Sequence, residues 1–102
     1  MSAQSELARA FLRLSWEDQR RFVMVALGRI LMAQRGTAKK LRPKHIAEVL
    51  RIPPHPAVLS NIIAHLRELR ELRVDGSVWT LECEMRVKRD GYAFYYTRRV
   101  VA

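Results

Sequence analysis

The sequence predicts a single α+β domain that is mostly α-helical, and three observations support this prediction. The chain has 102 residues, 49% of them apolar, which suits one domain with one core. Apolar side chains recur at helical spacing until about residue 71, whereas from Val78 onward they alternate with a period of two. Asp90-Gly91 then supplies the residues that a tight hairpin turn needs. We therefore expect helices followed by a C-terminal two-stranded β-hairpin.

Two helices are expected in the N-terminal part of the chain. A helical pattern covers about residues 6–13. Ser15 followed by Asp18 has the form of a capping box, and it begins a second helix that stops at Gly36. Residues 22–33 of this helix are apolar on nearly every side. Such a helix should be buried on more than one face.

A second copy of the chain is one way to cover this helix. A domain of this size has little interior for it, and Gly28 would let two helices approach closely. In such a homodimer, residues 1–36 would form the dimerisation part of the domain, and residues 37–102 would contain the later helices and the hairpin. The alternative is that the first helix and the apolar face of the hairpin cover the helix within one chain. The residues assigned to the dimer interface are Phe22, Val23, Ala26, Leu27, Gly28, Ile30 and Leu31.

Two more helices are expected before the hairpin. Residues 37–42 could form a short strand, and Pro43 suits the first position of a short helix that ends before Pro53-Pro54. Pro56 begins a longer helix that extends to about Glu71. The stripe of this helix that should be buried consists of Leu59, Ile62, Ile63, Leu66 and Leu69.

The register of the hairpin follows from its turn. A two-residue turn at Asp90-Gly91 places the apolar side chains of both strands on one face. A three-residue bulged turn would slide one strand and leave Phe94 and Tyr96 outside, so the first register is preferred. Arg98 is out of place on the apolar face in this register. The expected pairs are Val87 with Phe94, Met85 with Tyr96 and Leu81 with Val100.

The segment "RPKHIAEVLRIPPHPAVLSNIIAHLRELREL" resembles the helix-turn-helix unit of a winged-helix domain. The resemblance begins at Leu41, covers about 60 residues and rests on the order of the elements. It implies a winged helix-turn-helix with an extra N-terminal helix and a C-terminal two-stranded β-hairpin wing. In that family the second helix of the unit lies in the major groove of DNA and the wing contacts the backbone or the minor groove. The turn around Pro53-Pro54 is longer than in the compact motif and lacks glycine.

The charge of the chain favours a polyanionic partner. Nineteen Lys and Arg residues against ten Asp and Glu residues give a net charge of +9. The single cysteine, Cys83, fits a reducing compartment. The N-terminus has the pattern of neither a signal peptide nor a membrane anchor, and the longest apolar run is too short to span a bilayer. We therefore expect a cytoplasmic, nucleoid-associated protein.

The sequence offers no pattern typical of catalysis or metal binding. It contains no glycine-rich phosphate loop and no nucleophile motif. His45, His55 and His65 lie on different expected elements and should be surface residues rather than zinc ligands. We expect neither an enzyme nor a bound cofactor.

Candidate DNA-binding residues lie in two groups. Small and polar side chains on the helix that starts at Pro56 would face the groove, with His65 and Arg67 at its edge. Cations before the short helix and on the hairpin would hold phosphates, with tyrosines between them. The helix group is Ala57, Ser60, Asn61, Ala64, His65 and Arg67. The phosphate and wing group is Lys39, Lys40, Arg42, Lys44, Arg51, Arg86, Lys88, Arg89, Tyr92 and Tyr95.

The functional prediction is binding of double-stranded DNA, as a transcription regulator or as a nucleoid-type or chromatin-type protein. One alternative is an adaptor module that contacts protein or RNA within a larger nucleoprotein complex. Another is that the hairpin is a sheet edge whose charges discourage the addition of further strands.

Overall fold

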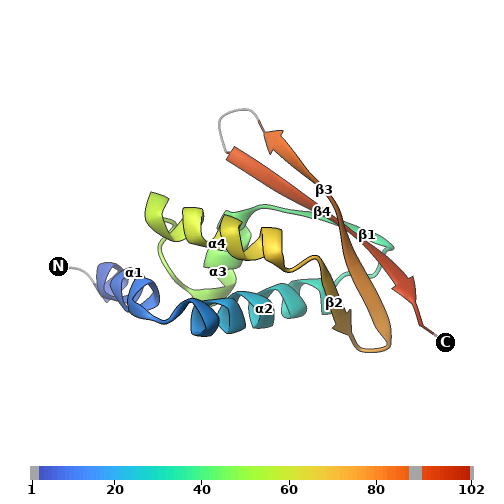
Figure 1. Cartoon of the computed structure of the whole chain (residues 1–102), viewed down its shortest axis with the longest axis horizontal. Coiled ribbons are helices and arrows are strands. Elements are labelled where there is room, and N and C mark those ends of the chain that lie inside the picture. The colour runs from blue at the N-terminus through green and yellow to red at the C-terminus, as the bar shows by residue number, and fades with distance from the viewer. Residues whose placement is uncertain (1–2, 88–90, 102) are drawn as a thin grey trace.

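The computed structural model describes residues 3–87 and 91–101, with the helices gathered on one side and a long hairpin extending away from them (Figure 1). The molecule measures 49 × 29 × 21 Å along its principal axes. The helices are α1 (Ala3–Arg13), α2 (Trp16–Met32), α3 (Pro43–Leu50) and α4 (Pro56–Glu68). The strands are β1 (Ala38–Leu41), β2 (Glu71–Val74), β3 (Ser77–Val87) and β4 (Gly91–Val100). They form one antiparallel sheet in the order β1-β4-β3-β2.

The expected winged helix-turn-helix with a two-stranded wing is wrong. Within the described residues, four helices pack with a four-stranded antiparallel sheet, so the architecture is α+β with a substantial sheet. Residues 38–41 form the edge strand β1, as the sequence allowed, and they pair with β4. The strand β2 was not expected, because the preceding helix was extended to about Glu71, whereas it stops at Glu68 and β2 begins at Glu71.

The turn between β2 and β3 is Asp75-Gly76. Asp75 has φ 46° and Gly76 has φ 78°, and Val74 pairs with Ser77 across them. Positive φ at both central residues is the signature of a type I′ hairpin turn, for which Asp-Gly is a preferred dipeptide. The Asp-Gly turn chemistry expected at residues 90–91 therefore operates here.

The expected register of the long hairpin is also wrong. Its connection, residues 88–90, lies outside the described residues, and Val87 pairs with Gly91. A bulge at Glu82 then shifts the register by one residue, because Cys83 pairs with Tyr95 but Leu81 pairs with Tyr96. The hydroxyl of Thr97 donates a hydrogen bond to the bulged Glu82 carboxylate at 2.6 Å. The observed pairs include Met85 with Ala93 and Glu84 with Phe94.

Local signals at the helix starts are confirmed. The Ser15 side chain accepts a hydrogen bond from the backbone N–H of Asp18 at 3.1 Å, and Pro43 and Pro56 occupy the first turns of their helices. The helix α2 ends at Met32, earlier than expected. No helix within residues 3–87 and 91–101 is long and apolar enough to cross a membrane.

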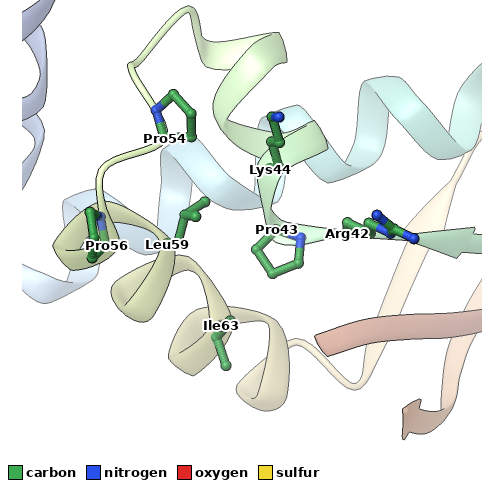
Figure 2. Close-up of a pocket in the computed structure, with 7 residues that line it drawn as sticks. All are labelled: Arg42, Pro43, Lys44, Pro54, Pro56, Leu59 and Ile63. Carbon is green, nitrogen blue, oxygen red and sulfur yellow. The ribbon is translucent and has the colours of Figure 1, made fainter. Parts of the chain in front are cut away.

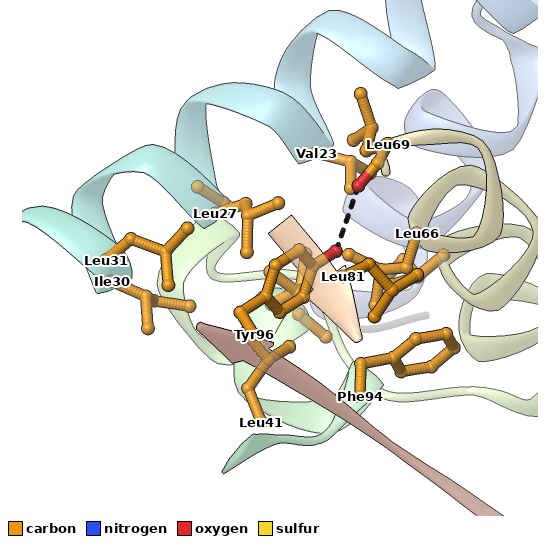
Figure 3. Close-up of a cluster of buried hydrophobic side chains, with 14 of the residues drawn as sticks. Val23, Leu27, Ile30, Leu31, Leu41, Leu66, Leu69, Leu81, Phe94 and Tyr96 are labelled. Carbon is orange, nitrogen blue, oxygen red and sulfur yellow. Dashed lines mark hydrogen bonds between the residues drawn. The ribbon is translucent and has the colours of Figure 1, made fainter. Parts of the chain in front are cut away.

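The core lies between the helices and the inner face of the sheet (Figure 3). Tyr96 is fully buried there, and its hydroxyl donates a hydrogen bond to the backbone carbonyl of Leu69 at 3.2 Å. Burial raises the pKa of the Tyr96 phenol above its usual value. The remaining core side chains drawn and labelled in Figure 3 are Val23, Leu27, Ile30, Leu31, Leu41, Leu66, Leu81 and Phe94.

This core corrects the expected dimer interface. Much of the apolar surface of α2 is covered by the chain itself, which was the alternative to a second subunit. Phe22 is half-exposed and Gly28 is partly exposed, so these two remain at the surface. The interface residues buried within the chain are Val23, Ala26, Leu27, Ile30 and Leu31.

Arg98 has a structural role that the expected register hid. It lies opposite Trp79, and its guanidinium stands 5.4 Å from the centroid of the indole. It also donates hydrogen bonds to the carbonyls of Gln34 and Arg35, at 3.4 and 2.9 Å, just beyond the end of α2. The cation therefore satisfies carbonyls where a helix terminus favours positive charge.

Candidate nucleic-acid-binding surface

A cavity of about 440 Å³ opens between the start of α3 and the outer side of α4 (Figure 2). Pro43 begins α3 directly after β1, so Arg42 and Lys44 stand at this junction. Leu59 and Ile63 of α4 are only partly buried and form the apolar side of the cavity. We call this cavity the cationic groove; its lining residues are Arg42, Pro43, Lys44, Pro54, Pro56, Leu59 and Ile63.

A second cavity, of about 350 Å³, adjoins the cationic groove and shares Arg42 and Lys44 with it. Lys40 from β1 adds a further cation, and Glu48 is the acid in this lining. Lys40, Arg42 and Lys44 are all exposed, and we call them the junction cations. Three like charges this close make a local positive potential that attracts anions.

The hairpin beyond the bulge at Glu82 is attached to α4 through Arg67. Arg67 donates hydrogen bonds from Nε at 3.0 Å and from Nη2 at 2.7 Å to the carboxylate of Glu84 on β3. Its guanidinium also stands 5.2 Å from the centroid of the Tyr92 ring on β4. These hydrogen bonds lower the pKa of Glu84 and raise that of Arg67. The contacts hold both strands of the hairpin against the helix.

Arg86 continues the same face of the hairpin toward its tip. It pairs with Tyr92 in the ladder, two residues beyond Glu84, and it is exposed. The strand β1 pairs with β4 up to Leu41 opposite Phe94, so Arg42 follows in the direction of Tyr92. Arg42 and Arg86 therefore lie around the same part of the sheet, whereas Lys40 pairs with Tyr95 and lies on the opposite face from Arg86. Lys88 and Arg89, also expected to contact phosphates, lie outside the described residues.

The helix α4 is rotated relative to the expectation. Its buried side is Val58, Ile62, His65 and Leu66, whereas Leu59 and Ile63 turn toward the cationic groove. The outward side still includes three residues of the expected DNA-binding face. Ala57 and Ser60 are exposed and Ala64 is half-buried.

His65 is buried and not a surface residue as expected, and Asn61 is bonded to Gln19, which corrects the exposed base-reading role expected of both. The Oε1 of Gln19 accepts a hydrogen bond from Asn61 Nδ2 at 3.2 Å and lies 3.1 Å from His65 Nε2. Trp16 stacks on the His65 ring with centroids 3.9 Å apart. His65 is 0% exposed, and burial together with the nearby charge of Arg20 lowers its pKa from 6.5 to about 4. Gln19 is a buried polar residue of α2 and therefore needs hydrogen-bond partners, and Asn61 and His65 of α4 supply them.

Three other expected residues are separated from this surface. Lys39 is half-buried and pairs with Tyr96, which places it on the inner face of the sheet. Arg51 lies at the C-terminal end of α3, away from Lys44 at its start. Tyr95 lies opposite Cys83 on the other face of the hairpin from Tyr92.

Sequence reasoning missed two features of this surface. Glu84 places an acid among the cations, where it pairs with Arg67. The sequence could have indicated this, because Glu84 and Arg86 are two residues apart in a strand and therefore lie on the same face. The partly exposed Leu59 and Ile63 were assigned to the core. A second stripe, which begins at Val58 and continues through Ile62 and Leu66, indicated that α4 could also be buried in another orientation.

Comparison with known proteins does not assign this surface a function. No protein-family model matches the chain, and neither a curated protein nor a solved structure does. Within the part of the chain that the structure describes, no group of three or more His, Cys, Asp or Glu side chains could hold a metal ion. What the surface does is therefore inferred from its geometry and charge.

Proposed function

We propose that this protein binds double-stranded DNA with the outward side of α4 and the cations beside it. The observation that carries the proposal is that Arg42 and Lys44 line the cationic groove beside α4, whose exposed residues include the small Ala57 and Ser60. An α-helix fits the major groove of B-DNA, and small side chains allow it to approach closely. Lys40, Arg42 and Lys44 would neutralise phosphates on one side, and Arg86 would do so on the hairpin side.

The proposed binding depends on phosphates more than on bases. Asn61 and His65 are engaged with Gln19, and Arg67 is paired with Glu84, so three of the side chains expected to read base edges are occupied. Phosphate contacts give affinity and orientation without sequence information. We therefore favour an architectural, nucleoid-type role inside the cell over a sequence-specific regulator.

The test is fluorescence anisotropy with a labelled mixed-sequence DNA duplex and with an RNA hairpin of similar length, at several salt concentrations. The four described cations predict a slope of log K against log salt of about −3 to −4 for DNA, since each phosphate contact contributes about −0.9. DNA should bind more tightly than the RNA hairpin, because the helix suits the DNA major groove and not the narrow major groove of RNA. Absence of DNA binding at low salt, or a clear preference for RNA, would refute the proposal.

A further inference from the structure

The outer side of α2 has an apolar stripe with coiled-coil spacing. Phe22, Val25 and Met32 are 50%, 52% and 64% exposed. Together with Asp18 and Arg29, they follow one another in steps of four, three, four and three residues along the helix. This is the spacing of the seam by which two helices pack in a coiled coil. We call Asp18, Phe22, Val25, Arg29 and Met32 the outer α2 stripe.

Phe22 stands between two hollows in the surface. One has a volume of about 330 Å³ and lies along α2, where Val25 and Leu14 line it. The other has a volume of about 300 Å³ and lies toward α1. The same surface therefore carries a protruding ring and adjacent apolar hollows of a kind that could receive one. Besides Phe22, the second hollow is lined by Leu7, Ala10, Phe11, Leu14, Leu50 and Ile52.

We propose that the outer α2 stripe binds a second copy of this chain, with the two α2 helices antiparallel about a two-fold axis. A register centred between Phe22 and Val25 places each Phe22 opposite Val25 of the other copy. The same register places each Asp18 opposite Arg29 of the other copy, so the two charged pairs form on both sides of the axis. A two-fold interface requires a patch that is complementary to itself, and this stripe meets that requirement.

The charge distribution supports the choice of a second copy as the occupant. The chain carries a net charge of +9, so most of its surfaces would repel another copy. The stripe itself contains one acid and one base, although Arg21 of the same helix borders it and pairs with Asp18 at 3.5 Å. The acid and the base also lie at the two positions that an antiparallel arrangement brings together. The stripe is therefore complementary in charge to a second copy of itself, and no other partner is needed to explain the match.

This proposal is independent of the proposed DNA binding. The stripe lies on α2, whereas the cations assigned to DNA lie on β1, at the start of α3 and on β3. A monomeric variant should therefore still bind DNA, and a variant that has lost DNA binding should still dimerise.

Sedimentation velocity of the full chain over a range of concentrations tests the dimer. The mass should rise from 11.9 kDa toward twice that value as the protein concentration increases. Val25→Glu should abolish this rise. Met24→Glu is the matched control, because Met24 is 37% exposed on the same helix but lies outside the stripe. A wild-type chain that stays monomeric, or a Met24→Glu variant that dissociates as fully as Val25→Glu, would overturn the proposal.

A charge exchange tests the register and the identity of the partner. Asp18→Arg should weaken dimerisation by about tenfold or more, because two arginines then face each other at both ends of the interface. Adding Arg29→Asp should restore the dimer. Circular dichroism confirms that each variant is folded at the temperature of the experiment. A double variant that dimerises no better than Asp18→Arg would overturn the antiparallel arrangement.

Discussion

Lowering the pH from 7 to 5 should destabilise the fold through His65. Burial and the charge of Arg20 lower the pKa of this histidine from 6.5 to about 4 in the folded chain. The folded state therefore favours the neutral ring, whereas the unfolded chain binds a proton near pH 6.5. The stabilisation is nearly complete above that pH and is lost as the pH falls from 6.5 toward 4.

The magnitude follows from these two pKa values. Proton linkage predicts that the free energy of unfolding falls by about 2 kcal/mol between pH 7 and pH 5. For a domain of this size, that loss corresponds to a decrease in the melting temperature of about 10 °C. Carboxylates titrate mainly below this window, so histidine dominates the change.

Urea denaturation followed by circular dichroism at pH 7, 6 and 5 measures this loss. His65→Gln should be less stable than the wild type at pH 7, but its stability should change little with pH. His55→Gln is the matched control, because His55 is exposed at the start of α4. It should keep the wild-type dependence. A wild-type stability that is flat from pH 7 to 5, or a His65→Gln variant with the wild-type slope, would refute this reasoning.

Three further predictions concern the turn, the end of α2 and the hairpin contact. Gly76→Ala should lower the free energy of unfolding by about 1–2 kcal/mol, since a side chain at positive φ is strained, and an unchanged urea midpoint would contradict this. Arg98→Ala should lower it by about 1–3 kcal/mol, because the change removes hydrogen bonds to carbonyls and the packing of the guanidinium on Trp79; a decrease below about 0.5 kcal/mol would argue against that role. Glu84→Gln should tighten DNA binding and steepen the salt slope by about 1, because Arg67 becomes free to contact phosphate, whereas weaker binding in the anisotropy titration would show that the ion pair is needed to hold the hairpin.

The sequence predicted those elements whose signals are local. Ser15, Pro43 and Pro56 act through the backbone within one turn of their own positions, so each helix start could be located without knowledge of the fold. The strand β2 could not be recognised in this way. It has only four residues, too few for alternation to appear, and the helical pattern of α4 extends into it.

The register of the long hairpin depends on interactions that the sequence does not display. The bulge at Glu82 lets Leu81 face Tyr96 while Glu84 faces α4, and it is stabilised by Thr97 across the ladder. A turn rule applied to Asp90-Gly91 cannot anticipate a bulge several residues away. The sequence did predict that Phe94 and Tyr96 face the core, because the alternation of side chains within β4 does not depend on which residues of β3 pair with it.

The candidate surface was predicted in part for the same reason. The junction cations are close in sequence, so their proximity in space was expected. The orientation of α4 was not, because it depends on Gln19, which lies 46 residues before His65 in the chain. Two stripes of α4, one beginning at Val58 and one at Leu59, are almost equally apolar, and the polar contacts to Gln19 accompany the first.

The central claim is that the junction cations and Arg86 hold DNA phosphates, and a comparison of two triple variants tests it most directly. The first variant combines Lys40→Gln, Lys44→Gln and Arg86→Gln. The control combines Arg13→Gln, Arg70→Gln and Arg73→Gln, which removes the same charge. All three positions are exposed: Arg13 ends α1, Arg70 directly precedes β2 and Arg73 lies in β2. Both are titrated with the same DNA duplex by fluorescence anisotropy between about 50 and 200 mM salt.

We predict that the first variant binds more weakly and that its salt slope is shallower by about 2–3, roughly one unit for each phosphate that the variant no longer neutralises. The control should keep a slope close to that of the wild type. If both variants show the same decrease in affinity and slope, DNA responds only to the net charge of the chain. That result would contradict a defined phosphate-binding surface at the start of α3 and on the hairpin.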